Sequence, residues 1–170
     1  MDIKDTVKQL RQDSKDYFLL HDMPLPISAE KMFNIMCKPE NWQVVNFPII
    51  KKVEVIESKD NSVSFYLYEK LLGKYYKSKI ILTYNINDLR IEYCHEKPTF
   101  PFVSKMASVW YFVNEDAYIS HFYIIRNFTV KNVFIKFFFL FIKKIIDKHV
   151  ADYHKQLIAV TKNLSLSNAK

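Results

Sequence analysis

The sequence of 170 residues contains a single glycine, Gly73. Loops that cradle phosphate groups, of the GxGxxG or GxxxxGKS/T type, need several glycines because the backbone must approach the phosphate closely. The two common classes of nucleotide-binding fold are therefore excluded.

Cysteines and long apolar runs are also scarce. Cys37 and Cys94 are too few for a disulfide framework and form no CxxC pair, which favours a reducing compartment. Residues 1–16 are charged throughout and contain no apolar segment of a secretory signal. Residues 137–142 are apolar, but a membrane span needs about twenty such residues. We expect a cytoplasmic protein without stable membrane insertion.

No sequence pattern indicates a metal site or a known nucleophile. His149 and His154 are five residues apart, so a helix would not place them on one face, and His21 and His121 have no neighbouring ligand residues. A Ser-His-Asp or Cys-His arrangement with a recognisable local motif is missing too. We expect no metal and no organic cofactor.

The formal net charge is +7. The basic residues are scattered along the chain, and no helix-turn-helix or zinc-finger pattern accompanies them, so we expect no nucleic-acid partner. An acidic macromolecular partner fits this charge equally well.

The pattern of apolar residues changes at Pro48, from a strand and two short helices before it to a series of strands after it. Residues 16–25 read as a strand, and Ser28 then caps a short helix. Pro39 begins a second short helix at the position that proline favours. Beyond Pro48, six runs rich in Val, Ile, Tyr and Phe are expected to form antiparallel strands. They are residues 49–58, 63–71, 74–85, 89–97, 104–115 and 117–130.

Residues 131–164 contain neither glycine nor proline, and their apolar side chains recur at three- and four-residue steps. This pattern predicts one long amphipathic helix. We expect a single α+β domain over residues 1–170, with an N-terminal extension at 1–15 and a loose tail at 165–170. A curved seven-stranded sheet would cover the apolar face of the helix.

This order of elements resembles the START-like superfamily (SRPBCC, helix-grip fold), and local motifs narrow the resemblance. PISAEKMFNIMCKPENW followed by FPIIKKVEVIE is similar to the opening of the polyketide cyclase/aromatase branch. PFVSKMASVWYF and HFYIIRNFTV are similar to two of its later strands. The match covers about residues 17–163. The superfamily also contains lipid, quinone and hormone carriers, so the fold does not decide the function.

The resemblance implies an aromatic cavity between sheet and helix, where a poly-β-ketone bound to an acyl carrier protein closes into an aromatic ring. It assigns Trp42, Met106 and Trp110 to substrate binding, and strand alternation adds Ser108 and Phe112. Further residues expected to contact the substrate are Tyr66, Tyr68, Tyr76, Ile124, Phe138 and Phe141. Ordinary core packing explains any single one of these aromatics better, but aromatics make up 16% of the chain, and this excess favours a cavity wall for the set as a whole.

Three residues are candidates for the chemistry. Arg126, in apolar surroundings, needs an oxygen partner, and an enolate or thioester oxygen would serve as well as a carboxylate would. His95 shares an apolar strand face and could accept a proton near pH 7, although a structural histidine fits too. Ser78 could hold a carbonyl group. The family's cationic residue near positions 80–82 has no match, and only Lys77 or Lys79 lies close enough to substitute.

Acyl carrier proteins are acidic, so the resemblance also gives the basic charge a use. Lys131, Lys136 and Lys143 are the expected docking residues, although the solvated face of any helix would look alike. We expect a monomer or a homodimer. The alternatives to an aromatase/cyclase are a quinone- or lipid-binding carrier, and an accessory protein of respiratory-quinone metabolism.

Overall fold

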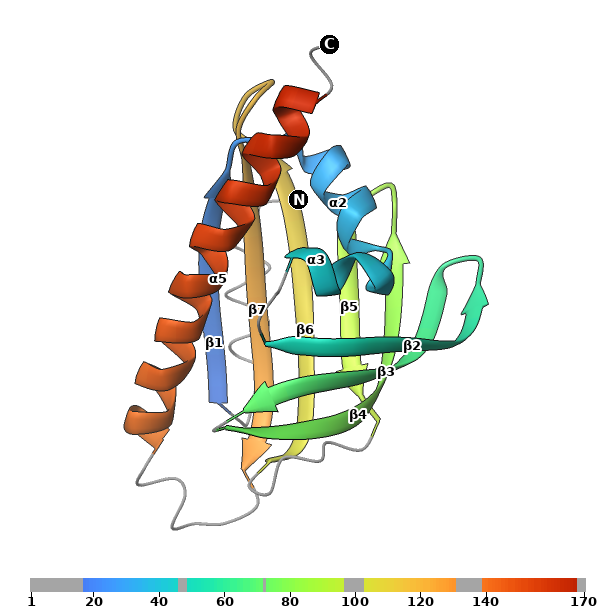
Figure 1. Cartoon of the computed structure of the whole chain (residues 1–170), viewed down its shortest axis with the longest axis vertical. Helices are drawn as coiled ribbons and strands as arrows, with labels where there is room; N and C mark the ends of the chain where they lie inside the picture. The colour runs from blue at the N-terminus through green and yellow to red at the C-terminus, as the bar shows by residue number, and fades with distance from the viewer. Residues whose placement is uncertain (1–16, 46–48, 72, 97–102, 131–138, 168–170) are drawn as a thin grey trace.

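The computed structural model describes residues 17–45, 49–71, 73–96, 103–130 and 139–167. Within these ranges the chain forms a seven-stranded antiparallel sheet in the order β1-β7-β6-β5-β4-β3-β2 (Figure 1). The strands are β1 (Tyr17–Leu25), β2 (Ile50–Lys59), β3 (Ser62–Leu71), β4 (Lys74–Asn85), β5 (Arg90–His95), β6 (Val103–Asn114) and β7 (Ser120–Val130). The helices are α2 (Ala29–Met36), the 3-10 turn η1 (Pro39–Asn41), α3 (Trp42–Val45) and α5 (Phe139–Ser167). The α+β class and the order of elements are as the sequence predicts.

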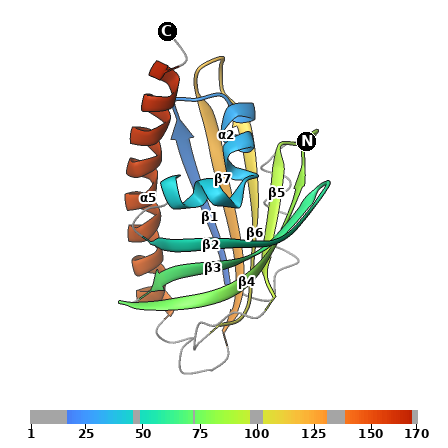
Figure 2. The same cartoon turned by 45° about the vertical axis from the view of Figure 1, so that its right-hand side comes forward.

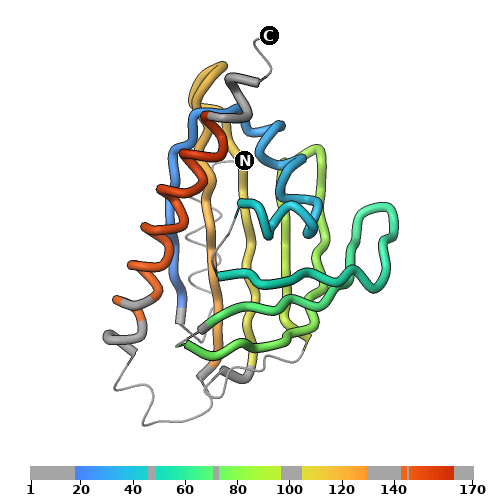
Figure 3. The backbone as a smooth tube through the Cα atoms, in the orientation of Figure 1, coloured from blue at the N-terminus to red at the C-terminus, as the bar shows by residue number. Residues whose placement is uncertain are grey.

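The sheet bends strongly along its length. In Figure 1 the strands β2, β3 and β4 run almost across the direction of β5, β6 and β7. The view in Figure 2 shows α5 standing alongside β1, on the side of the sheet that also carries α2 and α3. Figure 3 traces how the chain leaves β1, passes through the short helices and enters the opposite edge of the sheet with β2. The bend therefore brings strands together that are far apart in sheet order.

Local sequence determines the connection between β1 and β2. The Ser28 side chain accepts a hydrogen bond from the backbone N–H of Lys31, which caps α2. Pro39 occupies the first turn of η1. Proline fits there because N–H groups in the first turn make no hydrogen bond within the helix. The single glycine, Gly73, lies in the β3–β4 turn with φ of 80°, a conformation that other residues rarely adopt.

The long C-terminal helix is described from Phe139 onward, so the expected first part at 131–138 lies outside the described residues. Val150, Tyr153 and Leu157 are buried at three- and four-residue steps along α5. Opposite them, the inward-facing side chains of the strands are buried at every second position. In β5, for example, Ile91, Tyr93 and His95 are buried. A hydrophobic core thus lies between the sheet and the helices.

Candidate functional site

Arg126 lies on the inner face of β7. Its Cα pairs with Leu19 on β1 and with Ser108 on β6, whose side chains are both buried. Ile124 and Phe128, two residues to either side, are also buried on this face. The guanidinium group is therefore placed toward the interior, as the resemblance implied, and not toward solvent.

The charge of Arg126 acts on ionisable side chains from four other elements of the fold. In chain order, these are His21 (β1), Glu69 (β3), Tyr93 and His95 (β5) and Tyr153 (α5). We call these six residues the Arg126 cluster.

Burial keeps the histidines of the cluster uncharged. Desolvation, and secondly the charge of Arg126, lower the pKa of His21 and of His95 to about 4. Both imidazoles are therefore neutral at pH 7 and do not compete with an anion for the guanidinium group. Burial also raises the pKa of Tyr93 to about 12 and raises that of Tyr153, so both phenols remain hydrogen-bond donors.

Glu69 is the residue of the cluster that sequence reasoning missed. It pairs with Tyr76 across β4 and continues the inward alternation of Val63, Phe65 and Leu67 along β3. That alternation is a signal in the sequence, but no local pattern links Glu69 with Arg126, which lies four strands away in the sheet and acts on the carboxyl through its charge. Burial raises the pKa of Glu69 to about 7, against a smaller lowering by Arg126.

The cluster contains buried atoms that could receive a ligand. Glu69 Oε1, Arg126 Nε and His21 Nε2 have no hydrogen-bond partner among the residues that the structure describes. Each such atom costs about 1–3 kcal/mol of folding free energy. Arg126 acts on Glu69 through its charge and not through a hydrogen bond. An oxygen-rich ligand would satisfy groups that the fold itself leaves unsatisfied.

Predicted substrate-binding aromatics form a packed layer beside the cluster. The Trp42 ring centroid lies 5.2 Å from those of Phe65 and Trp110 and 6.0 Å from that of Tyr93. The Trp42 indole N–H donates to the carbonyl of Met36 at 2.9 Å. Trp42 and Trp110 are brought together as the resemblance implied, in a closely packed group of rings.

The hydroxyl of Ser108 is fully used within the protein. Its Oγ donates to the carbonyl of Ile125 and accepts from the indole N–H of Trp110, both at 2.9 Å. Ser108 therefore orients Trp110 and has no proton left for a substrate. Ser78 is 1% exposed on the inner face of β4, with Tyr76 two residues away on the same face.

The remaining predicted residues divide between two ends of the interior. Met106 pairs with Phe128, one inward-facing pair away from the Ser108–Arg126 pair. On the other side of that pair, Ile124 and then Phe112 lie successively closer to α2. The Phe112 ring stacks on Phe122 with centroids 4.7 Å apart, so it belongs to the apolar core below α2. Phe138 and the side chain of Phe141 lie outside the described residues.

Tyr66 and Tyr68 are on the outer face of the sheet, so the expectation that they contact a substrate in the interior is wrong. They pair with Lys79 and Lys77 on β4, and the Lys77 ammonium lies 3.8 Å from the Tyr66 ring centroid. The physical reason is parity, because Phe65 and Leu67 take the inward positions of β3. Lys77 and Lys79 also face outward and cannot replace the family's missing interior cation.

A surface cleft with a volume of about 520 Å³ lies between the α2–η1 segment and strands β2 to β4. Asn34, Lys38 and Glu40 line it together with half-buried Cys37. Burial raises the pKa of the Cys37 thiol to about 12, so this cysteine is not a nucleophile at neutral pH. None of the residues that line the cleft belongs to the Arg126 cluster.

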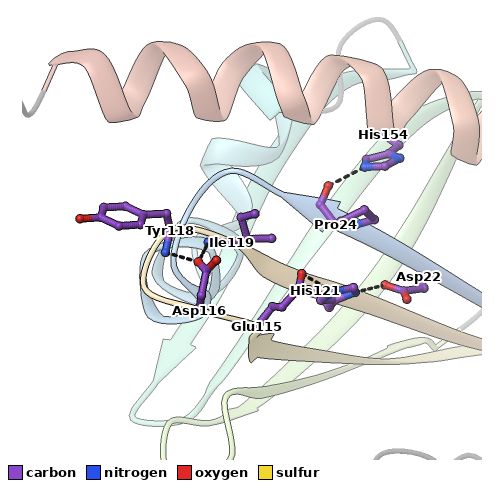
Figure 4. Close-up of polar contacts among 8 residues, drawn as sticks. All are labelled: Asp22, Pro24, Glu115, Asp116, Tyr118, Ile119, His121 and His154. Carbon is purple, nitrogen blue, oxygen red and sulfur yellow. Dashed lines mark hydrogen bonds and ion pairs between the residues drawn. The ribbon is translucent and has the colours of Figure 1, made fainter.

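A second polar group joins β1, β7 and the β6–β7 turn at the surface (Figure 4). His121 Nδ1 lies 2.7 Å from Asp22 Oδ1, and its Nε2 lies 3.1 Å from Glu115 Oε2. Close by, His154 on α5 contacts the carbonyl of Pro24 at 2.8 Å, which ties the helix to the edge strand. The partners of His121 are both acidic, and the first of them, Asp22, contributes most to raising its pKa.

The raised pKa of His121 makes its contribution to stability depend on pH. The stabilisation is fully present below the unfolded pKa of about 6.5 and is lost as pH rises through the higher folded pKa. We expect His121→Gln to lower the unfolding free energy by roughly 0.5–1 kcal/mol at about pH 6 and by little at about pH 9. Urea denaturation at both pH values measures this, with exposed His149→Gln as control. An equal loss at both pH values would contradict the ion-pair account.

Among the described residues, no group of three or more His, Cys, Asp and Glu side chains could hold a metal ion. Within the same ranges, no helix has both the length and the apolar character to cross a membrane. The candidate site is therefore the Arg126 cluster with the aromatic layer beside it.

Comparison with solved structures identifies the fold. No family model matches the sequence, and no curated protein matches it either. Among solved structures, the Zhui aromatase/cyclase from Streptomyces sp. R1128 has a TM-score of 0.75 at 13% identity, covering 86% of this chain and 93% of its own. The chain has the START-like, helix-grip fold.

Two further solved structures are also similar to this chain. A START superfamily protein from Mycobacterium smegmatis has a TM-score of 0.67 at 15% identity, covering 86% of this chain and 98% of its own. Norcoclaurine synthase from Thalictrum flavum, in complex with dopamine and hydroxybenzaldehyde, has a TM-score of 0.65 at 12% identity, covering 88% and 90%. At these identities the similarity concerns the fold, and the function must be argued from the site.

Proposed function

We propose that the protein is a cytoplasmic aromatase/cyclase of type II polyketide biosynthesis. It would fold a poly-β-ketone bound to an acyl carrier protein and catalyse intramolecular aldol cyclisation and dehydration to an aromatic ring. The observation that supports this most is Arg126, a cation beside a layer of rigid aromatic rings and next to two neutral imidazoles. Similarity of fold to aromatase/cyclases agrees with it.

The reaction needs positive charge where negative charge develops. Removal of a proton between two carbonyl groups produces an enolate, and its attack on a third carbonyl produces an alkoxide. A desolvated guanidinium group stabilises both oxyanions more strongly than water would, because it is already oriented toward them. Arg126 takes this role, because it lies on the inner face of β7, paired with buried Ser108 on β6.

The reaction also needs a bend in a flexible chain. Holding two carbons of one chain in near-attack geometry contributes several kcal/mol by avoiding lost entropy in the transition state. The ring layer of Trp42, Tyr93 and Trp110 supplies a stiff apolar surface beside Arg126 for this purpose. Ser108 contributes indirectly, since its two hydrogen bonds fix the Trp110 indole.

The outer face of β2–β4 is our proposed docking surface for the acidic carrier protein. Lys51 and Lys70 both lie over the ring of Tyr75, at 4.9 and 5.9 Å from its centroid, and Tyr75 is 53% exposed. The adjacent Lys77 extends the basic surface along the sheet, while Lys52 and Lys79 nearby are paired with Glu54 and Glu96. The helical surface predicted from the sequence, with Lys131, Lys136 and Lys143, stays a prediction. Lys131 and Lys136 lie outside the described residues, and Lys143 is paired with Asp147 at 2.6 Å.

Charge reversal tests this surface. We expect Lys51→Glu combined with Lys70→Glu to lower kcat/KM for a carrier-bound substrate about tenfold at low salt, through slower association. Activity on the same substrate released from the carrier should not change. Reversal of exposed Lys155 on α5 is the matched control. Equal kcat/KM for the double variant and the unchanged protein at low salt would exclude this face as the docking site.

Reconstitution with a minimal polyketide synthase tests the proposed function itself. The protein should increase the share of one aromatic product and reduce products of spontaneous cyclisation. An identical product profile with and without the protein would contradict an aromatase/cyclase function.

The second candidate is a non-catalytic carrier of a quinone or lipid. It is favoured by the diversity of similar structures, which include a START superfamily protein alongside the enzymes. A carrier should copurify with its ligand, and Arg126→Ala should leave the binding of that ligand nearly unchanged.

A further inference from the structure

The inference concerns how the interior site moves a proton. Glu69 approaches the inner face from the end of β3 and Arg126 from β7, two strands that are four places apart in the sheet. Both carry a buried hydrogen-bonding atom without a partner among the described residues, Glu69 Oε1 and Arg126 Nε. The fold therefore holds an acidic and a basic group in one interior without joining them by a hydrogen bond.

We propose that Glu69 and Arg126 form an acid–base pair for a weakly acidic, oxygen-bearing ligand, either a phenol or a 1,3-dicarbonyl compound. The Glu69 carboxylate takes the ligand's O–H or C–H proton, and Arg126 holds the resulting oxyanion. For its biological ligand the proposal rests on the proposed function, where the acid is a methylene group between two ketones.

The steps balance in protons and electrons. Glu69 gains a proton as a C–H bond breaks, and that electron pair forms an enolate whose oxygen lies at Arg126. The enolate carbon then bonds to a second carbonyl carbon, and the new alkoxide takes the proton back from Glu69. In the dehydration, Glu69 removes a second C–H proton and returns it to the departing hydroxide, which leaves as water.

Glu69 suits this role better than His95 does. Burial brings the carboxyl to a pKa of about 7, which matches proton exchange at neutral pH. Burial lowers the pKa of His95 to about 4, which makes it a weak base. The charged or titratable groups that act on Glu69 are Arg126 from β7 and Tyr93 from β5, while its strand neighbours are Tyr76 and Ile50.

The test uses 7-hydroxycoumarin, whose phenol and phenolate absorb differently. Calorimetric titration in buffers of different ionisation enthalpy, at about pH 7, gives the number of protons exchanged on binding. We expect the unchanged protein to bind phenolate with a net release of about half a proton per ligand, because at pH 7 a carboxyl with a pKa of about 7 is half ionised and can take up about half a proton. Glu69→Gln should also bind phenolate but release about one proton per ligand to the buffer. Arg126→Gln should lose the phenolate absorbance.

Two control variants make the result specific. Glu92→Gln changes an exposed carboxylate on the outer face of β5 and should behave like the unchanged protein. His95→Gln should also retain the proton count. Failure of the unchanged protein to bind phenolate, or an unchanged proton count in Glu69→Gln, would overturn the proposal. An effect of His95→Gln alone would assign the proton to His95. None of these outcomes depends on polyketide turnover, so the reconstitution above tests the proposed function separately.

Discussion

An Arg126→Gln variant is expected to close the ring about 10²–10³ times more slowly than the unchanged protein, with little loss of stability. This is the usual effect of removing one oriented group that stabilises an oxyanion. Glutamine keeps hydrogen-bonding capacity at the site but removes the charge. Single-turnover conversion of carrier-bound substrate measures the rate. Arg90→Gln, which changes an arginine paired with Glu92 on β5, is the matched control and should be nearly as fast as the unchanged protein.

The same variant has a second effect that does not depend on any substrate. Because the charge of Arg126 lowers the pKa of both His21 and His95, its removal should raise both pKa values. NMR titration of the histidine ring protons measures this change. A slow variant with unchanged histidine pKa values would mean that Arg126 acts outside the cluster. Shifted histidines with an unchanged rate would mean that the cluster has no part in catalysis.

The second large effect is expected at Trp42. Trp42→Ala removes a side chain that is 3% exposed and contacts the rings of Phe65, Tyr93 and Trp110. It also leaves the Met36 carbonyl without the indole donor. We expect the unfolding free energy to fall by roughly 3–5 kcal/mol, from lost burial and the cavity that remains.

Urea denaturation of Trp42→Ala measures this loss, followed by circular dichroism because the substitution removes a fluorophore. Tyr118→Ala is the control, since Tyr118 is 80% exposed and should change stability little. Trp42→Phe should lie between the two, because it keeps a ring but loses the N–H donor. A stable Trp42→Ala protein with an altered product profile would instead identify Trp42 as a wall of an open substrate cavity.

Much of the fold could be predicted from the sequence, because hydrophobic period and turn residues are local properties. Runs rich in Val, Ile, Tyr and Phe predicted the six strands after Pro48, and Ser28 and Pro39 marked the helix starts that the structure has. Strand parity was also readable in β3, where Phe65 and Leu67 are the stronger inward residues. Tyr66 and Tyr68 were assigned to the interior because they are aromatic. The alternation of side chains along the strand instead places them on the outer face.

The composition of the site was harder to predict. Arg126 and His95 were found from their apolar flanking residues, and both are on the inner face. Glu69 could not be connected to them, because its strand lies four places from that of Arg126 in the sheet and no local pattern links the two. The same holds for Ser108, whose hydroxyl is used by a carbonyl seventeen residues away.

The central claim is that ligands bind in the interior beside Arg126. Methyl NMR of the methionines tests it most directly, with 7-hydroxycoumarin as ligand. Met106 lies next to the row of Arg126 on the inner face, whereas Met32 and Met36 lie in α2, adjacent to residues of the surface cleft. The account predicts a saturable shift of the Met106 methyl signal that Arg126→Gln abolishes. Shifts confined to Met32 and Met36 would place the ligand at the cleft and contradict the account.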